Sequence, residues 1–209
     1  MIKIISQLPL KDPTLDEMFL GRAMVFHDRL NWDVVLQDGR EIDKYDRSES
    51  PVYIVSLDDC GRVIGSLRIL PTTGPTMLKN DFRNMFQDDV DIDCPTTWEC
   101  TRFCVHLSDG RQNLAKGAAL ELLLGLCNLA LASGIDTIVG VYEAAMERIY
   151  KRLGWSPLLL AKSYPEFGCI NFGIWEVSSG VSNILENQIK KLNMTKSIFS
   201  NKLSCTLNP

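Results

Sequence analysis

The segment from Thr97 to Val105 places the tightest limit on how this chain folds. It reads Thr-Trp-Glu-Cys-Thr-Arg-Phe-Cys-Val, and its β-branched and aromatic residues favour a strand in the middle of a domain. Glu99 and Arg102 lie inside this apolar segment, where a charge is costly unless it is paired or used. Two interpretations follow: the two side chains form a structural ion pair at a strand end, or they are an active-site base and its partner.

The segments around this strand predict an α/β fold. The leucine-rich stretch that ends at about Ala132 is apolar on nearly every helical face, which indicates a helix buried inside the domain, and the apolar strand at 136–142 is typical of parallel pairing. The order predicts a single-domain three-layer sandwich over residues 1–180, with a mixed central β-sheet flanked by helices, followed by a C-terminal helix and loose tail over 181–209. The remaining expected elements are strands at 2–6, 51–57, 62–70 and 168–177, helices at 13–29, 77–86, 144–153 and 179–192, and a long loop at 32–46.

Composition excludes several classes of protein. The 209 residues are enough for one sizeable core, and the net charge of −4 is far from that of a nucleic-acid binder. No apolar run approaches the roughly 18 residues of a membrane span and the N-terminus has no signal-peptide pattern, so we expect a cytoplasmic protein. Seven cysteines without a Cys-x-x-Cys pair fit a reducing compartment, and two histidines make a metal site unexpected.

A second set of charged and aromatic residues lies before the central strand. Arg22 and Phe26 are four apart on one predicted helix face, and Trp32, Asp43 and Asp46 follow in the predicted loop. An arginine can clamp a carboxylate, aromatic rings can hold an adenine or a sulfonium, and carboxylates can hold an amine. The alternative is a helix that packs through Phe26 with Trp32 as a hydrophobic plug. For Arg68, in the hairpin strand at 62–70, the alternative is an exposed strand arginine.

The order and spacing of these residues resemble the acyl-homoserine-lactone (autoinducer) synthases over about residues 1–180. The resemblance rests on the motifs Val-Phe-x-x-Arg-Leu-x-Trp, Leu-Arg-Ile-Leu-Pro-Thr-Thr-Gly-Pro-x-Met-Leu and Trp-Glu-x-Thr-Arg-Phe-x-Val. It implies a GNAT-like acyltransferase fold that acts in quorum sensing, with S-adenosylmethionine and an acyl thioester as substrates and no separate cofactor. The thioester is usually on acyl carrier protein and in some members on coenzyme A. The products are an N-acyl-homoserine lactone and methylthioadenosine.

This resemblance gives the candidate residues their expected roles. Glu99 is the expected general base, because the methionine amine must lose a proton as it attacks the thioester. Thr101 is expected to contact the acyl carbonyl, with backbone N–H groups of the strand holding the oxyanion. Arg102 is the third expected catalytic residue and also braces the pocket for S-adenosylmethionine. The residues expected to bind S-adenosylmethionine are Arg22, Phe26, Trp32, Asp43, Asp46 and Arg68. A regular strand places Arg102 on the face opposite Glu99 and Thr101, so we predict a bulge near residues 99–102.

The acyl donor is expected to meet the second half of the chain. The helix start Gln112-x-x-Ala115-x-Gly117 is a degenerate form of a coenzyme-A-binding loop, in which Ala115 replaces the first glycine, and this favours carrier protein over an ordinary coenzyme A site. An ordinary helix start is the alternative. A basic face for an acidic carrier protein is expected from Arg111, Lys116, Arg148, Lys151 and Arg152, with a solvated helix face as the alternative.

An apolar slot for the acyl chain is expected along the buried helix. Its expected lining is Met77, Phe82, Phe103, Leu122, Tyr142 and Met146, which serve equally well as plain core residues. Members that favour a 3-oxo chain tend to have a threonine where this chain reads Gly140-Val141-Tyr142, so we expect an unsubstituted or otherwise unusual acyl group. Two further hypotheses stay open from the sequence: a coenzyme-A-dependent GNAT-type N-acetyltransferase, and a non-catalytic module that binds an acyl or adenosyl ligand.

Overall fold

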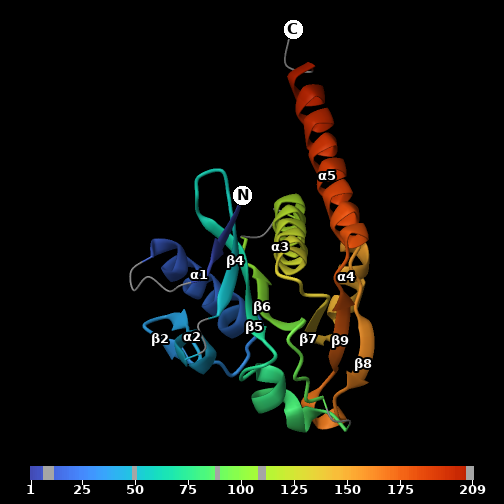
Figure 1. The fold of residues 1–209 in the computed structure, drawn as a ribbon. Helices are drawn as coiled ribbons and strands as arrows, with labels where there is room; N and C mark the ends of the chain where they lie inside the picture. Colours follow the sequence, from blue (N-terminus) through green and yellow to red (C-terminus); the bar gives the residue numbers. More distant parts are fainter. Residues whose placement is uncertain (7–11, 49–50, 88–89, 108–111, 206–209) are drawn as a thin grey trace.

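A mixed β-sheet forms the middle layer of the structure, a computed structural model that describes residues 1–6, 12–48, 51–87, 90–107 and 112–205 (Figure 1). Among the described strands of this sheet, only β6 and β7 pair in parallel, and every other pair of neighbours is antiparallel. In spatial order the strands are β1 (Ile2–Ile5), β4 (Val52–Leu57), β5 (Val63–Pro71), β6 (Thr97–Val105), β7 (Thr137–Glu143), β9 (Ile170–Glu176) and β8 (Leu158–Lys162).

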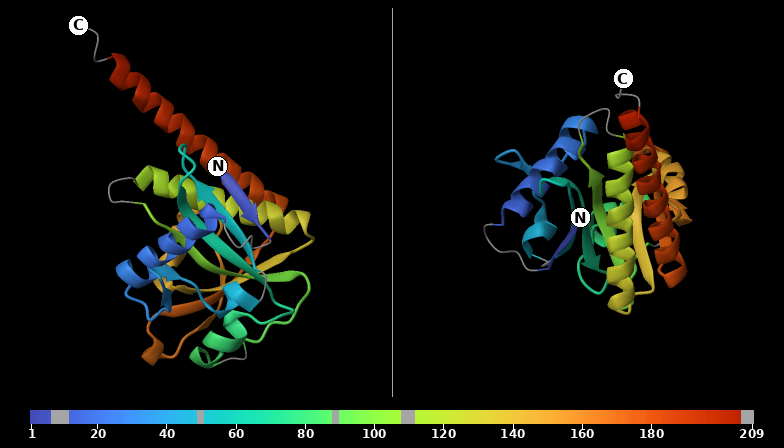
Figure 2. Two further views of the ribbon diagram at one scale, coloured as in Figure 1. Left: turned by 90° about the vertical axis from the view of Figure 1, so that its left-hand side faces the viewer. Right: turned by 90° about the horizontal axis from the view of Figure 1, so that it is seen from above.

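Helices cover both faces of this sheet, so the predicted three-layer α/β sandwich is confirmed (Figure 2). One face holds α1 (Pro13–Ala23) with the hairpin β2 (Leu36–Gln37)–β3 (Arg40–Glu41) and α2 (Lys44–Ser48). The other face holds α3 (Gln112–Ala132), α4 (Glu147–Leu153) and α5 (Ser179–Cys205). The short helices are the π-helices η1 (Met24–Arg29) and η2 (Leu78–Phe82) and the 3₁₀ turns η3 (Arg83–Met85), η4 (Ala144–Met146) and η5 (Pro165–Phe167).

The helix α1 begins where local chemistry favours a helix start. The Asp12 carboxylate accepts a hydrogen bond from the Thr14 N–H at 2.8 Å, and Pro13 occupies the first helical position, where no backbone N–H is needed. Met18 then packs against the strands β4 and β5. The chain continues beyond Ala23 as the π-helix η1, so the predicted helix at 13–29 is confirmed with a change of helical type.

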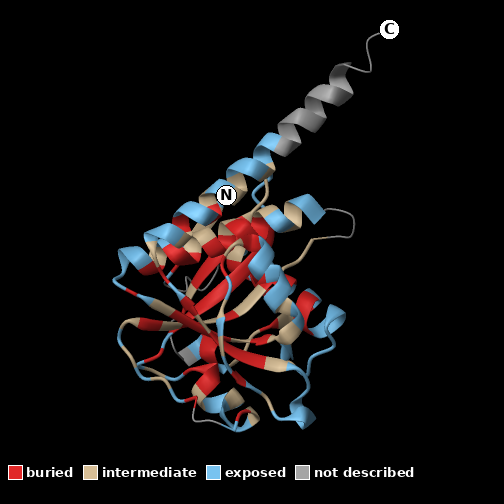
Figure 3. Ribbon diagram, turned by 90° about the vertical axis from the view of Figure 1, so that its right-hand side faces the viewer, coloured by how far each residue is buried: buried red, intermediate tan, exposed pale blue. Residues whose placement is uncertain are grey.

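The helix α3 is the core helix of the opposite layer. It is the one helix among the described residues that is long and apolar enough to cross a membrane, but it packs between the sheet and α5. Leu120 and Leu122 are fully buried there, and Leu185 of α5 completes the same core. Figure 3 shows the buried residues, in red, gathered where the helices meet the sheet. This packing confirms the buried helix expected from its leucine-rich sequence.

Three segments differ from the sequence prediction. The expected loop at 32–46 contains a hairpin and a helix; the turn at Asp38-Gly39 has positive φ at both residues, which is the geometry that an Asp-Gly pair favours in tight hairpins. The edge strand β8 was not predicted, because a short apolar run does not distinguish a strand from a helix. The helix α5 runs to Cys205 rather than 192, since no glycine or proline interrupts the sequence there.

The parallel strands β6 and β7 separate halfway along their length. Their paired residues run only from Thr97 to Glu99 on β6 and from Thr137 to Val139 on β7. At the point of separation Gly140 lies so close to β6 that an added Cβ would come within 3.1 Å of the Cys100 carbonyl oxygen. The gap beyond this point places the candidate site in the middle of the sheet.

Candidate active site

A cleft of about 1200 Å³ passes through the gap between β6 and β7. On the α1 side it is lined by charged and aromatic residues, which we call the polar arm; on the α3 side it is lined by apolar residues, which we call the apolar arm. Lining residues of the polar arm include Phe26, Trp32, Glu41, Asp43 and Arg102. Lining residues of the apolar arm include Leu123, Leu126, Met146, Tyr150 and Trp175.

A bulge in β6 brings Arg102 to the polar arm. Arg68 of β5 pairs with Thr101 and Ser66 pairs with Cys104, so one residue of β5 lies opposite two residues of β6. Arg102 has a φ of 53°, in the left-handed region that most residues avoid. The bulge predicted near residues 99–102 is therefore confirmed, with Arg102 as its left-handed residue.

The bulge also reverses which face of β6 each side chain takes. Before it, Cys100 packs toward the core under α3; after it, Phe103 and Val105 face that same core although a regular strand would turn them away. Cys104 packs instead with Phe26 of η1. One inserted residue thus lets a single strand contribute to the polar arm and to the wall of the apolar arm.

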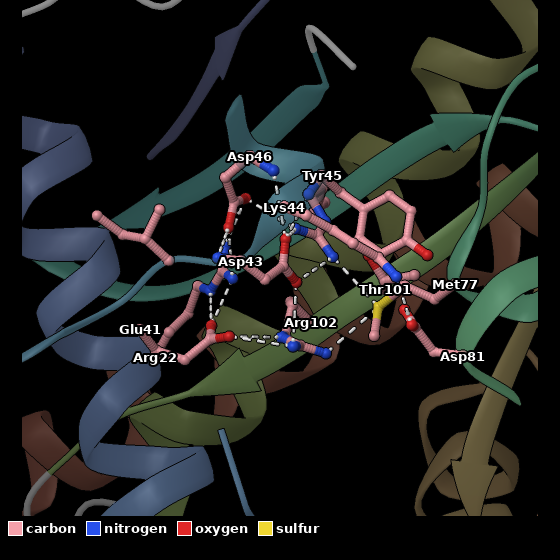
Figure 4. Close-up of polar contacts among 12 residues, drawn as sticks. Arg22, Glu41, Asp43, Lys44, Tyr45, Asp46, Met77, Asp81, Thr101 and Arg102 are labelled. Atoms are coloured by element: carbon pink, nitrogen blue, oxygen red, sulfur yellow. Dashed lines mark hydrogen bonds and ion pairs between the residues drawn. The ribbon is translucent and has the colours of Figure 1, made fainter. Parts of the chain in front are cut away.

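Arg22 lies at the centre of a buried network of ion pairs (Figure 4). Its guanidinium donates two hydrogen bonds of 3.0 Å to the Asp46 carboxylate and others to Glu41. All three side chains are at most 2% exposed. Tyr53 of β4 donates to Asp46 at 2.7 Å and Arg68 of β5 donates to it at 2.8 Å, so side chains from three elements satisfy this carboxylate. Burial by itself raises the pKa of Asp46, but Arg22 and Arg68 hold it well below its ordinary value.

Arg68 and Arg102 extend the network to the cleft. Arg68 donates to both oxygens of Asp43, at 2.6 and 2.9 Å, and to Thr101 Oγ1 at 3.0 Å. Arg102 donates to Glu41 Oε1 at 3.0 and 3.2 Å and lies 3.1 Å from Asp43. Arg68 is fully buried, so it is not the exposed strand arginine of the alternative interpretation.

The three guanidiniums of this network face three carboxylates, which balances its charge. Glu41 was missed by the sequence analysis, yet it is 1% exposed and joins Arg22 to Arg102. The available signal was the acidic spacing Glu41-x-Asp43-x-x-Asp46 in a segment with two buried arginines to satisfy. Breaking such a network leaves an uncompensated buried charge, so its members depend on one another.

Glu99 lies outside this network and forms no ion pair with Arg102. The interpretation of these two side chains as a structural ion pair is therefore wrong. Its carboxylate instead accepts hydrogen bonds from the backbone N–H groups of Met77 and Leu78, each at 2.8 Å. The side chain is fully buried and is not among the residues that line the cleft. Burial raises the pKa of Glu99 to about 7, although the two backbone amides lower it.

Residues 76–82, which we call the strap, separate Glu99 from the cleft. The Met77 sulfur accepts hydrogen bonds from Arg68 at 3.2 Å and from Arg102 at 3.3 Å. Tyr45 of α2 donates to the Thr76 carbonyl at 2.9 Å, and Lys44 forms an ion pair with Asp81 at 2.6 Å (Figure 4). The strap includes the π-helix η2, a type that is frequent at functional sites.

Phe26 and Trp32 form the aromatic wall of the polar arm. Their rings stack with centroids 5.1 Å apart and an interplanar angle of 28°, and the Arg102 guanidinium lies over the Phe26 ring. Phe26 is buried, whereas Trp32 is 37% exposed. Trp32 therefore presents an exposed ring face and does not fill the core as a hydrophobic plug. Such a face suits a flat or cationic ligand group.

The apolar arm is built from α3, α4 and three strands. Of the six expected acyl-pocket residues, Met77, Phe82, Phe103, Tyr142 and Met146 line the cleft. Leu122 does not, because its side chain packs against Gly65 of β5 instead. The row that faces the cleft is Ala119, Leu123 and Leu126, which follow one another at helical spacing.

The expected basic residues that the structure describes lie on α3 and α4, near the apolar arm of the cleft. Lys116 and Arg152 line it and are exposed, and Arg148 and Lys151 are exposed on α4. Arg111 lies outside the described residues. The described residues contain no cluster of histidine, cysteine and acidic side chains suited to a metal. Burial raises the pKa of the Cys100 thiol to about 12, so this cysteine at the cleft is not a thiolate nucleophile.

Comparison with known proteins identifies relatives over most of the chain. The model of the autoinducer synthase family matches residues 7–168. The acyl-homoserine-lactone synthase of Rhizobium etli is 47% identical over 194 residues, 92% of either chain. The crystal structure of the AHL synthase LasI matches with a TM-score of 0.77 at 30% identity and covers 88% of this chain and 93% of LasI.

Other solved structures bear mainly on the fold. BjaI, a CoA-dependent acyl-homoserine lactone synthase solved with MTA and also with SAM and isopentyl-CoA, matches with a TM-score of 0.78 at 25% and 24% identity, covering 91% of this chain and 89% of that one. A Lactobacillus plantarum protein assigned to the N-acetyltransferases matches with a TM-score of 0.55 at 17% identity, and Escherichia coli ElaA matches with a TM-score of 0.54 at 15% identity, which concerns the fold alone. The expected GNAT-like fold is therefore confirmed.

Proposed function

Because the chain belongs to the autoinducer synthase family and is an acyl-homoserine-lactone synthase, we propose how its two-armed cleft divides the reaction. The enzyme transfers an acyl group from an acyl thioester to the amine of S-adenosylmethionine and closes the lactone. It thereby forms an N-acyl-homoserine lactone and methylthioadenosine. The observation that carries our proposal is the cleft itself, which joins a charged pocket on one face of the sheet to an apolar pocket on the other.

S-adenosylmethionine binds in the polar arm. The stacked Phe26 and Trp32 offer an aromatic face for the adenine or the sulfonium. Asp43, which is 16% exposed, offers a carboxylate to the amine, while Arg102 offers a guanidinium to the substrate carboxylate. Arg22, Asp46 and Arg68 are more deeply buried and keep these groups in position.

The acyl chain lies in the apolar arm, and the thioester lies where β6 and β7 separate. Beyond Glu99 the edge of β6 that faces β7 has no strand pairing among the described residues, so its backbone N–H groups are available to the oxyanion. Thr101 lines the cleft beside this edge, with its hydroxyl held by Arg68. These donors act where negative charge develops on the acyl carbonyl oxygen.

Glu99 is the proposed general base. A carboxylate whose pKa is about 7 is partly ionised at neutral pH and matches the proton-transfer task. As the amine nitrogen attacks the carbonyl carbon, its proton passes to Glu99 and the carbon–sulfur bond of the thioester breaks. The carrier leaves as a thiolate, which then takes the proton from Glu99 to become a thiol. Because the strap covers Glu99, this step requires the strap to withdraw or a water to relay the proton.

Lactone closure then mainly requires that the acylated substrate be held in a folded conformation. The substrate carboxylate attacks its own γ-carbon, the bond from that carbon to the sulfonium breaks, and methylthioadenosine leaves as a neutral thioether. A network that fixes three guanidiniums against three carboxylates provides a rigid frame for this folded conformer.

The acyl donor is acyl carrier protein in our proposal. The exposed Arg148 and Lys151 lie on the same short helix as Arg152, which lines the cleft, so an acidic carrier docked there delivers its chain to the apolar arm. Ala115 at the helix start, where a coenzyme-A-binding loop has a glycine, also favours the carrier-linked donor. The competing donor is coenzyme A, the donor in the name of BjaI. Because both kinds of donor are made in the cytoplasm, we place the enzyme there.

The test is product formation by the purified protein. It is given S-adenosylmethionine with an acyl chain on carrier protein or on coenzyme A, and lactone and methylthioadenosine are measured by mass spectrometry and chromatography. We expect both products, with the carrier-linked donor preferred. Faster turnover of the coenzyme A donor would overturn the donor assignment, and acyl transfer without methylthioadenosine would indicate a simple N-acetyltransferase.

A further inference from the structure

The Met77 sulfur occupies a position that suits a much stronger hydrogen-bond acceptor. One N–H of Arg68 and one of Arg102 converge on it, at 3.2 and 3.3 Å. A thioether is a weak acceptor, whereas a carboxylate is the preferred partner of a guanidinium. The remaining hydrogen bonds of both guanidiniums are to carboxylates or to the Thr101 hydroxyl, so the sulfur is the weakest of their hydrogen-bond acceptors.

Met77 is also the residue that covers Glu99. Its backbone N–H donates to one carboxylate oxygen and the next N–H, from Leu78, donates to the other. The sulfur contact and the cover over the base are therefore made by one residue. Since Met77 is only 6% exposed and its free side is the cleft, a substrate that displaces the sulfur must either turn the side chain within the cleft or shift the strap backbone.

We propose that the carboxylate of S-adenosylmethionine replaces the Met77 sulfur between Arg68 and Arg102 and thereby loosens the strap and uncovers Glu99. The inference rests on the proposed role of Glu99 as base. Met77 is then a positioning residue that couples substrate binding to access to the base. This coupling sets the order of events. The amine reaches Glu99 only after the carboxylate is bound, and Glu99 stays covered while the polar arm is empty.

Hydrogen exchange of the strap amides tests this coupling in the unmodified enzyme. The ligands are S-adenosylmethionine, decarboxylated S-adenosylmethionine, which keeps the sulfonium and an amine, and methylthioadenosine. We expect S-adenosylmethionine to raise the exchange of the Met77 and Leu78 amides about 10-fold, as for the loss of one hydrogen bond. The two ligands without a carboxylate should leave these amides as they are.

A matched pair of variants separates the hydrogen-bonding role of the Met77 sulfur from the space-filling role of its side chain. Met77→Leu removes the acceptor and keeps an apolar side chain, so the strap amides should exchange faster without ligand and respond no further to S-adenosylmethionine. The midpoint of the pH profile of kcat/KM should also fall below that of the wild type, because Glu99 is less covered. Met85→Leu changes another methionine of the cleft, which lies outside the hydrogen bonds that Arg68 and Arg102 make to Met77, and it should leave the response of the Leu78 amide to S-adenosylmethionine unchanged.

Two results overturn the inference alone. The first is that S-adenosylmethionine slows hydrogen exchange in peptides from residues 22–46, while the strap amides exchange at the same rate as before or more slowly. The second is a Met77→Leu variant whose strap exchanges and responds as in the wild type. If S-adenosylmethionine protects no part of residues 22–46, the polar arm is not its site and the proposed function fails instead.

Discussion

Replacing Glu99 by glutamine tests the proposed base most directly, because the structure predicts different effects on stability and on turnover. The carboxylate is fully buried and accepts two backbone hydrogen bonds of 2.8 Å. Glutamine offers one oxygen, so one strap N–H would face an amide NH₂ group. Leaving a buried donor unsatisfied costs about 1–3 kcal/mol.

The loss of the charge acts in the opposite direction and depends on pH. The pKa of Glu99 is about 7 in the folded state against an ordinary 4.5. The folded state therefore binds this proton more tightly than the unfolded state, and the free energy of unfolding falls as the pH rises from about 4.5 to about 7. At about 1.4 kcal/mol per pH unit the total is about 3 kcal/mol. Glu99→Gln should thus be clearly destabilising at pH 5 and nearly neutral at pH 8.

Turnover should respond far more strongly than stability. Without a base, kcat/KM should fall by about 10²- to 10⁴-fold, and the rise of the rate through a midpoint near pH 7 should disappear. Methylthioadenosine release measures the rate, and urea unfolding at pH 5 and pH 8 measures stability. Glu176→Gln, at an exposed strand end, is the matched control and should behave as the wild type.

The refuting result is specific. If Glu99→Gln changes stability as described but keeps the wild-type rate and the wild-type pH profile, then Glu99 only caps the strap. Another group would then accept the proton of the amine. An equal loss of rate and of folded protein would likewise point to a structural role.

Three further perturbations test other parts of the site. Trp32→Ala should raise the Kd for S-adenosylmethionine at least about tenfold by calorimetry, because it removes half of the stacked pair, and an unchanged Kd would place the adenosyl group elsewhere. Glu41→Gln should lower the free energy of unfolding by about 3–5 kcal/mol in urea, since Arg22 and Arg102 lose a buried partner, and a loss below about 1 kcal/mol would contradict the network. Lys151→Glu with Arg152→Glu should raise KM for the carrier-linked donor and leave the coenzyme A donor unaffected, and an equal effect on both would remove the docking face.

The sequence by itself determined most of the elements and the family. Helix starts, turns and strand alternation depend on neighbours in the chain, which is why the central strand was predicted with the bounds that β6 has. The motifs around Arg22, Trp32 and Glu99 likewise need no tertiary information to be read. The bulge was also predicted from the sequence, because strand alternation places Glu99 and Arg102 on opposite faces whereas the resemblance to the family required both at one pocket.

Only the tertiary structure decided which charges are partners. Glu41 comes from a short hairpin and joins two arginines from distant elements, and Glu99 turned away from Arg102 to the strap. The same holds for Leu122, because a helix that is apolar on all faces does not reveal which row meets the cleft. Ion pairs and cleft walls form between segments far apart in the chain, and their energies depend on burial and distance, which no local pattern encodes.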